Sequence, residues 1–187
     1  MNNSGAKFTL LSLAAMLTLT LQGCAILASR PVGNAAVPEP TRSVELERYL
    51  GRWFEIYRYE APFQEDCDAV TADYALNENG TINVLNSCRK GGASGPLTTV
   101  NGTAKVVDSI TNAKLRVTFF WPFYGDYWVI DHDPEYQWSI VGEPSGTYLW
   151  VLSREATPDQ ASRNELRQRV EELGYDWGLI RETRHPQ

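Results

Sequence analysis

Eight short segments rich in β-branched and aromatic residues follow one another along the chain, with turn-forming clusters between them. The clusters at 77–80 and 143–146, for example, combine Asn or Ser with Gly. Short turns join neighbouring antiparallel strands, and eight strands lose their exposed edges when the sheet closes on itself. We therefore predict an all-β, eight-stranded antiparallel up-and-down barrel. The predicted strands are 52–59, 69–76, 81–86, 98–107, 114–120, 127–130, 136–141 and 148–153.

One helix is predicted after the last strand. The residues at 157–160 resemble a capping box with Pro at the first helical position. Leu166, Val170 and Leu173 then recur at helical spacing, which gives a single apolar stripe. Such a helix packs against the outside of a barrel rather than within it. A last short strand at 179–180 is the remaining expectation for the C-terminal region.

The composition excludes several functions. The 187 residues carry a net charge of −6 and only four lysines, without the basic stripe of a phosphate-tracking nucleic-acid binder. Two histidines and three cysteines, with no Cys-x-x-Cys pair, leave few ligands for a zinc or haem site. We expect no nucleic-acid partner, no metal and no cofactor. The oligomeric state does not follow from the sequence.

The N-terminal region has the pattern of an export signal. A polar start that ends in Lys7 precedes the apolar run 8–21, which is shorter than the ~20 residues needed to span a bilayer. The next residues, ending in Cys24, resemble a bacterial lipobox, from which Gln22 departs. We predict a signal peptide at 1–23, acylation of Cys24 as the membrane anchor, and a tether at 24–42. The alternative is a plain signal peptide with an incidental Cys.

The identity of the residue after Cys24 bears on location. By analogy with bacterial lipoprotein sorting, where Asp at this position retains the protein in the inner membrane, Ala25 indicates the outer membrane of a Gram-negative bacterium.

Cys67 and Cys88 are predicted to form a disulfide. They flank the hairpin turn at 77–80 almost symmetrically, which places them opposite each other on neighbouring strands. An export signal would deliver them to an oxidising compartment. The alternative is a pair of free buried thiols.

Three motifs in order resemble those of the lipocalin family. Gly51 and Trp53 form a Gly-x-Trp motif, 133–136 resembles the second motif without its usual Thr-Asp pair, and 149–154 resembles the third. The segments 49–56, 123–130 and 148–154 look more narrowly like bacterial outer-membrane lipocalins and apolipoprotein D. The resemblance covers about 44–184 and implies a lipocalin domain at 43–187.

The topology places two motif residues together. In a meander, Trp53 begins the first strand and Arg154 ends the eighth, and closure makes these strands neighbours. A guanidinium stacked on an indole would seal this end of the barrel, stabilising it by ~0.5–2 kcal/mol. We predict a structural role for this pair. By the same alternation, the turns at 60–68, 91–97, 121–126 and 143–147 share the opposite, open end.

The barrel interior is the predicted ligand site. With Arg154 inward, the period of two points Tyr148, Trp150 and Leu152 inward as well, and alignment to the family extends this parity to the other strands. Asn86, Tyr74 and Tyr127 are expected to meet a polar head group near the mouth. The alternative is a barrel packed solid. The predicted ligand-binding residues are Ala72, Tyr74, Val84, Asn86, Val100, Leu115, Val117, Phe119, Tyr127, Val129, Ser139, Val141, Tyr148, Trp150 and Leu152.

The resemblance implies a membrane-anchored, non-enzymatic protein that binds, stores or transports fatty acids or lysophospholipids, with another small hydrophobic ligand as an alternative. A barrel enzyme of the isomerase kind would have to use Glu55, Asp131, His132 or Asp133. The last three are expected in a solvated loop at the closed end, away from the pocket. An envelope protein-interaction module is a third possibility.

Aromatic residues gather at the predicted open end. They include Phe63, the run 119–124 and Tyr148. Either they approach a membrane interface, where aromatic rings are favoured, or they pack against one another.

Overall fold

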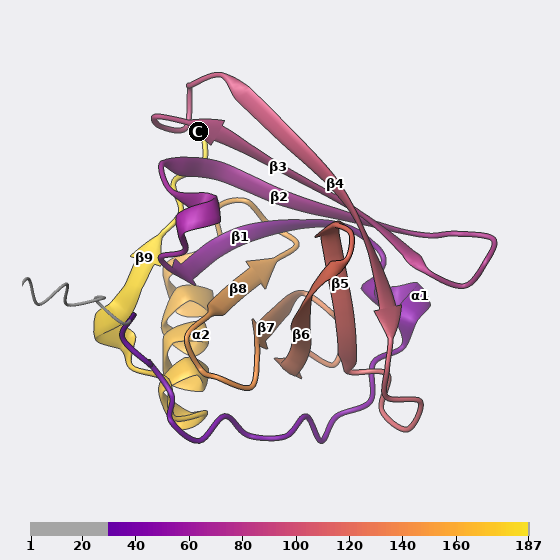
Figure 1. The fold of residues 1–187 in the computed structure, drawn as a ribbon. Helices are drawn as coiled ribbons and strands as arrows, with labels where there is room; N and C mark the ends of the chain where they lie inside the picture. The colour runs from indigo at the N-terminus through magenta and orange to yellow at the C-terminus, as the bar shows by residue number, and fades with distance from the viewer. Residues whose placement is uncertain (1–29, 187) are drawn as a thin grey trace, which may run out of the picture.

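The computed structural model describes residues 30–186, so the predicted signal peptide at 1–23 and Cys24 lie outside it. The strands form one antiparallel sheet that closes into a barrel because β1 pairs with both β2 and β8 (Figure 1). The predicted fold class is confirmed. The strands are β1 Gly51–Tyr59, β2 Cys67–Leu76, β3 Ile82–Lys90, β4 Leu97–Val106, β5 Lys114–Phe120, β6 Phe123–His132, β7 Trp138–Gly142, β8 Leu149–Ser153 and β9 Ile180–Glu182.

Alternation along the strands produces two apolar cores. On β8, Trp150 and Leu152 belong to the core inside the barrel, whereas Leu149 and Val151 pack under the C-terminal helix α2 (Gln160–Glu172). Figure 1 shows α2 lying against the outside of the barrel wall. Because side chains alternate between the two faces of a strand, one strand contributes both to the lining of the barrel and to the surface that α2 covers.

The helix α2 begins slightly later than predicted. Asp159 is the N-cap and its carboxylate accepts a hydrogen bond from the Ser162 amide at 2.8 Å, so Pro158 precedes the cap and does not occupy the first helical position. Leu166 and Val170 are fully buried against the barrel. Each such burial stabilises the fold by roughly 1.5–3 kcal/mol.

The predicted last strand is present as β9 and fills a gap in the barrel wall. Direct pairing between β1 and β2 covers only Gly51–Phe54, and β9 pairs with β1 beyond this point. Asp68 on β2 is buried and binds Arg181 and Arg184 at 3.2 and 2.6 Å. Burial opposes ionisation of Asp68, but hydrogen bonds from Arg184 and the Arg181 charge outweigh it, so its pKa is lowered.

The region between β6 and β7 differs from the prediction. β6 runs on to His132, and β7 starts after Tyr136, whose φ of +57° places it in a turn. The predicted solvated loop was therefore wrong for Asp131 and His132, which are buried at the end of β6. Asp131 forms an ion pair with Arg169, and the His132 ring stacks on Tyr136 at 4.6 Å.

A short helix that the sequence analysis did not predict closes one end of the barrel. This helix, α1 (Leu46–Tyr49), precedes β1 and places Tyr49 in the interior core. Two single-turn 3-10 segments, Pro62–Gln64 and Trp177–Leu179, complete the regular structure. Among residues 30–186, no helix combines the length and the apolar character needed to cross a bilayer.

Candidate functional site

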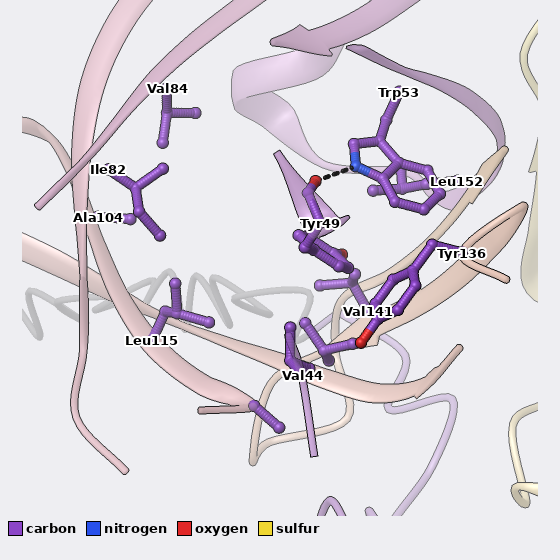
Figure 2. Close-up of a cluster of buried hydrophobic side chains, with 12 residues drawn as sticks. Val44, Tyr49, Trp53, Ile82, Val84, Ala104, Leu115, Tyr136, Val141 and Leu152 are labelled. Carbon is purple, nitrogen blue, oxygen red and sulfur yellow. Dashed lines mark hydrogen bonds between the residues drawn. The ribbon is translucent and has the colours of Figure 1, made fainter. Parts of the chain in front are cut away.

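A cavity of about 720 Å³ occupies the barrel interior. Its deep border is formed by α1 and by apolar residues of the surrounding strands. Figure 2 shows Ile82, Val84, Ala104 and Leu115 on one side of this interior, facing Tyr49 across it. At the other end the cavity is bordered by Phe120 and Phe123, which are strongly exposed. The cavity therefore opens at the end that carries the β5–β6 turn.

Most of the predicted ligand-binding positions border this cavity. The alternative of a barrel packed solid does not hold. The predicted residues that line the cavity are Ala72, Tyr74, Val84, Asn86, Val100, Leu115, Val117, Phe119, Tyr127, Val129, Trp150 and Leu152.

Ser139, Val141 and Tyr148 do not border the cavity. Ser139 faces inward, but its hydroxyl bonds the Tyr49 hydroxyl at 2.9 Å, and Val141 is fully buried in the same packed layer. Tyr148 stacks on Trp150 at the rim, with ring centroids 5.8 Å apart. The first two are covered because α1 delivers Tyr49 into the barrel, which strand parity alone does not reveal.

Tyr74 and Tyr127 lie at the closed end, not near the mouth as predicted. Their hydroxyls are 3.0 Å apart, and Tyr127 also bonds Tyr49 at 3.1 Å. Burial raises the pKa of Tyr49 to about 12 and that of Tyr127 well above its ordinary value. The three phenols therefore stay neutral and satisfy one another, so the deep part of the cavity carries no charge from them.

Polar groups at the cavity border also occur toward the mouth. The buried Glu55 carboxylate accepts hydrogen bonds from Arg58 at 2.8 Å and from the side-chain amide of Gln64. Gln64 in turn accepts a hydrogen bond from the Trp150 indole at 3.1 Å. Sequence reasoning did not find Gln64, because it lies in the single-turn 3-10 segment after β1, which has no periodic pattern.

Asn86 is a residue of the cavity border, in the described part of the chain, with an unpaired buried side-chain atom. Its Oδ1 is buried and has no hydrogen-bond partner among residues 30–186. An unpaired buried acceptor costs roughly 1–3 kcal/mol unless a ligand or water supplies a donor. Asn86 is therefore a place where a hydroxyl or amine of a ligand would gain a hydrogen bond.

The predicted disulfide between Cys67 and Cys88 is confirmed. It joins β2 to β3 with the two Cα atoms 5.4 Å apart, and both residues border the cavity toward its mouth. The bridge packs against Val70. The bridge therefore crosslinks two neighbouring strands of the barrel wall toward the mouth.

The predicted stacking of Arg154 on Trp53 is present at the closed end. The guanidinium lies 3.7 Å from the indole ring centroid and donates hydrogen bonds to the carbonyls of Arg48, Leu50 and Arg52 at 2.8, 2.9 and 2.6 Å. Arg154 thus joins α1 to the start of β1. The geometry is that of a seal and includes no contact with the cavity.

The alternative catalytic residues do not converge. Asp131, His132 and Asp133 are absent from the cavity border, while Glu55 is held by Arg58. No group of three or more His, Cys, Asp or Glu in the described residues has an arrangement that would hold a metal ion.

Comparisons with known proteins agree on one family. A family model described as a lipocalin-like domain matches residues 44–185. Temperature-induced lipocalin-1 of Arabidopsis thaliana is 38% identical over 154 residues, covering 78% of this chain and 81% of the relative. Outer membrane lipoprotein Blc of Vibrio cholerae is 34% identical over 154 residues, covering 82% of this chain and 90% of the relative.

Solved structures agree on the fold. Insecticyanin from the tobacco hornworm Manduca sexta superposes with a TM-score of 0.65 at 16% identity, covering 84% of this chain and 89% of that chain. At this level of identity the likeness is one of architecture.

Proposed function

Because the chain belongs to the lipocalin-like family, we propose that it is a lipid carrier of the bacterial cell envelope, which binds, stores or transports fatty acids or lysophospholipids in its barrel. The observation that carries the proposal is the cavity of about 720 Å³ inside a closed barrel. Small-molecule sites measure ~300–1,000 Å³ and are mostly apolar with a few polar groups. This cavity has both properties.

An acyl chain fits the distribution of polarity along the cavity. The deep wall is formed by apolar residues such as Ile82, Ala104 and Leu115, which would contact the methylene groups. Each buried methylene stabilises the complex by about 0.8 kcal/mol, so a single chain offsets the cost of association. The methyl end of the ligand would then lie near Leu115 and α1.

The polar head group belongs at the mouth in this proposal. Asn86 offers an unpaired acceptor, and the Trp150 indole can exchange its bond to Gln64 for one to the ligand. Lys90 also borders the cavity there, with its ammonium bonded to the Glu65 carbonyl at 2.6 Å. A head group with both donors and acceptors is matched by these three residues.

Binding without covalent chemistry is the mode of action that this site supports. Both carboxylate oxygens of Glu55 accept hydrogen bonds, from Arg58 and Gln64. The cavity border of the described chain also includes Asp126, on β6, but no histidine. Because Arg58 and Gln64 already hold both carboxylate oxygens of Glu55, this border favours a carrier over an acid–base isomerase.

We further propose that Cys24 is acylated and anchors the protein in the outer membrane, facing the periplasm. The support is the lipobox-like sequence that ends in Cys24, together with relatives that are named outer membrane lipoproteins. Mass spectrometry of the chain purified from bacterial membranes tests this, with Cys24→Ser as the control. An unmodified Cys24 in a soluble chain, or fractionation with the inner membrane, would contradict the placement.

The binding proposal is tested by titrating the delipidated protein with lysophosphatidylcholine and with a fatty acid while following tryptophan emission. Trp150 borders the cavity, so the Trp150→Phe variant identifies its share of the signal. We expect a saturable change with a single site, in the micromolar range or tighter. The absence of a saturable change with every acyl ligand would defeat the carrier proposal.

A further inference from the structure

The segment before α1 is bound to the barrel rather than free of it. The amides of Gly33 and Asn34 donate to the Gly146 carbonyl at 3.0 and 3.3 Å, and the Asp176 amide donates to the Gly33 carbonyl at 2.9 Å. The Asn34 side chain donates to the Leu173 carbonyl at 2.9 Å. Figure 1 shows this indigo segment running along the outside of the barrel, from α1 toward the side of β9 and α2.

Two glycines make this contact possible. A Cβ at Gly33 would lie 2.1 Å from the ring of Tyr59, which is buried and held by its hydrogen bond to the Asp176 carbonyl. A Cβ at Gly146 would lie 1.8 Å from the Asn34 carbonyl oxygen. The close approach requires both positions to lack a side chain, so the segment occupies a site shaped for it.

The bound segment ends at the open end of the barrel. Gly146 belongs to the β7–β8 turn, and the Arg30 guanidinium bonds the Tyr148 hydroxyl at 2.6 Å and lies 5.4 Å from the centre of that ring. Cys24 precedes Arg30 by six positions, which span at most about 21 Å when fully extended. An acyl anchor on Cys24 is therefore restricted to the neighbourhood of the mouth.

The same end presents exposed aromatic rings. Phe120, Trp121 and Phe123 at the β5–β6 turn are 74, 81 and 78% exposed, and Phe63 beyond β1 is 68% exposed. The alternative of a collapsed aromatic rim therefore does not hold for Phe120, Trp121 and Phe123, whereas Phe63 packs on Tyr148 with ring centroids 5.5 Å apart. Phe63, Phe120 and Phe123 also border the cavity, so the apolar surface continues into it.

We propose that the docked segment at 30–34 acts as a clasp that turns the mouth of the barrel toward the membrane holding the anchor. The rings at 120–123 and Phe63 then enter the bilayer interface, where aromatic side chains are favoured. A lipid would pass between the bilayer and the cavity along continuous apolar surface. This inference rests on the proposed acylation of Cys24, and it names the surface from which the carrier takes its ligand.

The test uses the full acylated chain, purified from membranes and reconstituted into vesicles of phosphatidylethanolamine and phosphatidylglycerol that contain a brominated phospholipid. Subtracting the tryptophan emission of the Trp121→Phe variant from that of the unsubstituted chain gives the emission of Trp121. We expect the bromolipid to remove the larger part of this emission. Ile110→Trp in the Trp121→Phe background is the matched control, because Ile110 is 88% exposed on the β4–β5 turn at the opposite end.

The tryptophan introduced by Ile110→Trp should not be quenched by the brominated phospholipid. Equal quenching at both ends, or an unquenched Trp121 in a chain that floats with the vesicles, would overturn the proposed orientation. A chain that does not float with vesicles would overturn it as well, by removing the anchor on which it rests. Selective quenching of Trp121 in a chain that binds no lysophospholipid would keep the orientation and reject the carrier function.

The clasp itself is tested by Gly33→Val, which places atoms inside the Tyr59 ring, and by Asn34→Ala, which removes the bond to Leu173 without adding volume. Ala35→Val is the matched control, since Ala35 is exposed on the same segment. We expect both clasp variants to float with vesicles and to lose most of the selective quenching of Trp121, while Ala35→Val retains it. Undiminished quenching in a folded Asn34→Ala and a folded Gly33→Val would overturn the role of the clasp.

Discussion

The two ends of this barrel are built from the same strands and behave in opposite ways. At the closed end, Arg154 donates to five backbone carbonyls and covers Trp53, and the phenol of Tyr49 is fully hydrogen-bonded. At the open end, Phe120 and Trp121 are mostly exposed. Each strand therefore contributes to stability at one end, where its polar groups are satisfied within the barrel, and at the other end borders the open mouth of the cavity.

The largest expected effect comes from breaking the closed end. Arg154→Ala uncaps the carbonyls of α1 and exposes the Trp53 ring, so we expect the free energy of unfolding to fall by about 3 kcal/mol. Urea denaturation measures this. The number of ligand sites in the folded fraction should not change. Arg167→Ala on the exposed face of α2 is the control and should cost less than about 0.5 kcal/mol. Equal costs for the two variants would reject the closed end as the main seal.

A second pair of variants compares the packed part of the barrel interior with the part that borders the cavity. Ala113 and Ala104 are both buried, but Ala104 borders the cavity and Ala113 does not. Ala113→Leu should destabilise the protein by about 2 kcal/mol through overpacking. Ala104→Leu should change stability by less than about 1 kcal/mol and weaken acyl-ligand binding at least about tenfold, because it fills the cavity. Similar stability losses in both variants would mean that the cavity does not accept added atoms.

A third variant asks how much the open end contributes to stability. Asp68 holds β9 in the wall through Arg181 and Arg184, and Asp68→Asn should cost about 2 kcal/mol. Since the folded pKa of Asp68 is below its unfolded value, this stability is present above pH ~4 and is lost as the pH falls through the folded pKa. The difference between wild type and variant should therefore shrink in acid. Asp73→Asn, at a partly exposed ion pair with Arg52, should cost less than about 1 kcal/mol at every pH.

The smallest effect concerns the phenols at the closed end. Burial raises the pKa of Tyr49 to about 12, above the unfolded value of ~10. The corresponding stability is complete below pH ~10 and is lost as the pH rises toward about 12. Tyrosinate absorbance should show a group of late-titrating phenols, reduced by one in Tyr49→Phe. Ionisation of all tyrosines near pH 10 in the folded protein would contradict a sealed end.

Features that depend on strand periodicity were predictable from the sequence. The disulfide between Cys67 and Cys88 follows from their symmetry about one turn, and the stacking of Arg154 on Trp53 follows from closure of a meander. Both rest on geometry that repeats from strand to strand. For this reason the barrel could be predicted without coordinates, and alignment to the family extended the inward positions from the eighth strand to most of the cavity border.

Features that depend on contacts between distant segments were not predictable in this way. The helix α1 is a single turn with no periodic signal, yet it decides that Ser139 is covered by Tyr49. The docking of Gly33 against Tyr59 likewise depends on two positions whose proximity no local pattern encodes. The left-handed Tyr136, which delays β7, is held by its packing on His132.

The separation of the two ends is tested most directly by locating a ligand crystallographically. The ligand is a fatty acid that carries bromine at its terminal methyl group, bound to the delipidated protein. The anomalous signal of the bromine should lie inside the barrel near Leu115 and Ile82, with the carboxylate at the mouth beside Lys90 and the Trp150 indole, which can donate hydrogen bonds to it. Bromine at the mouth, or on the outer surface of the barrel, would contradict a sealed apolar end and an open polar one.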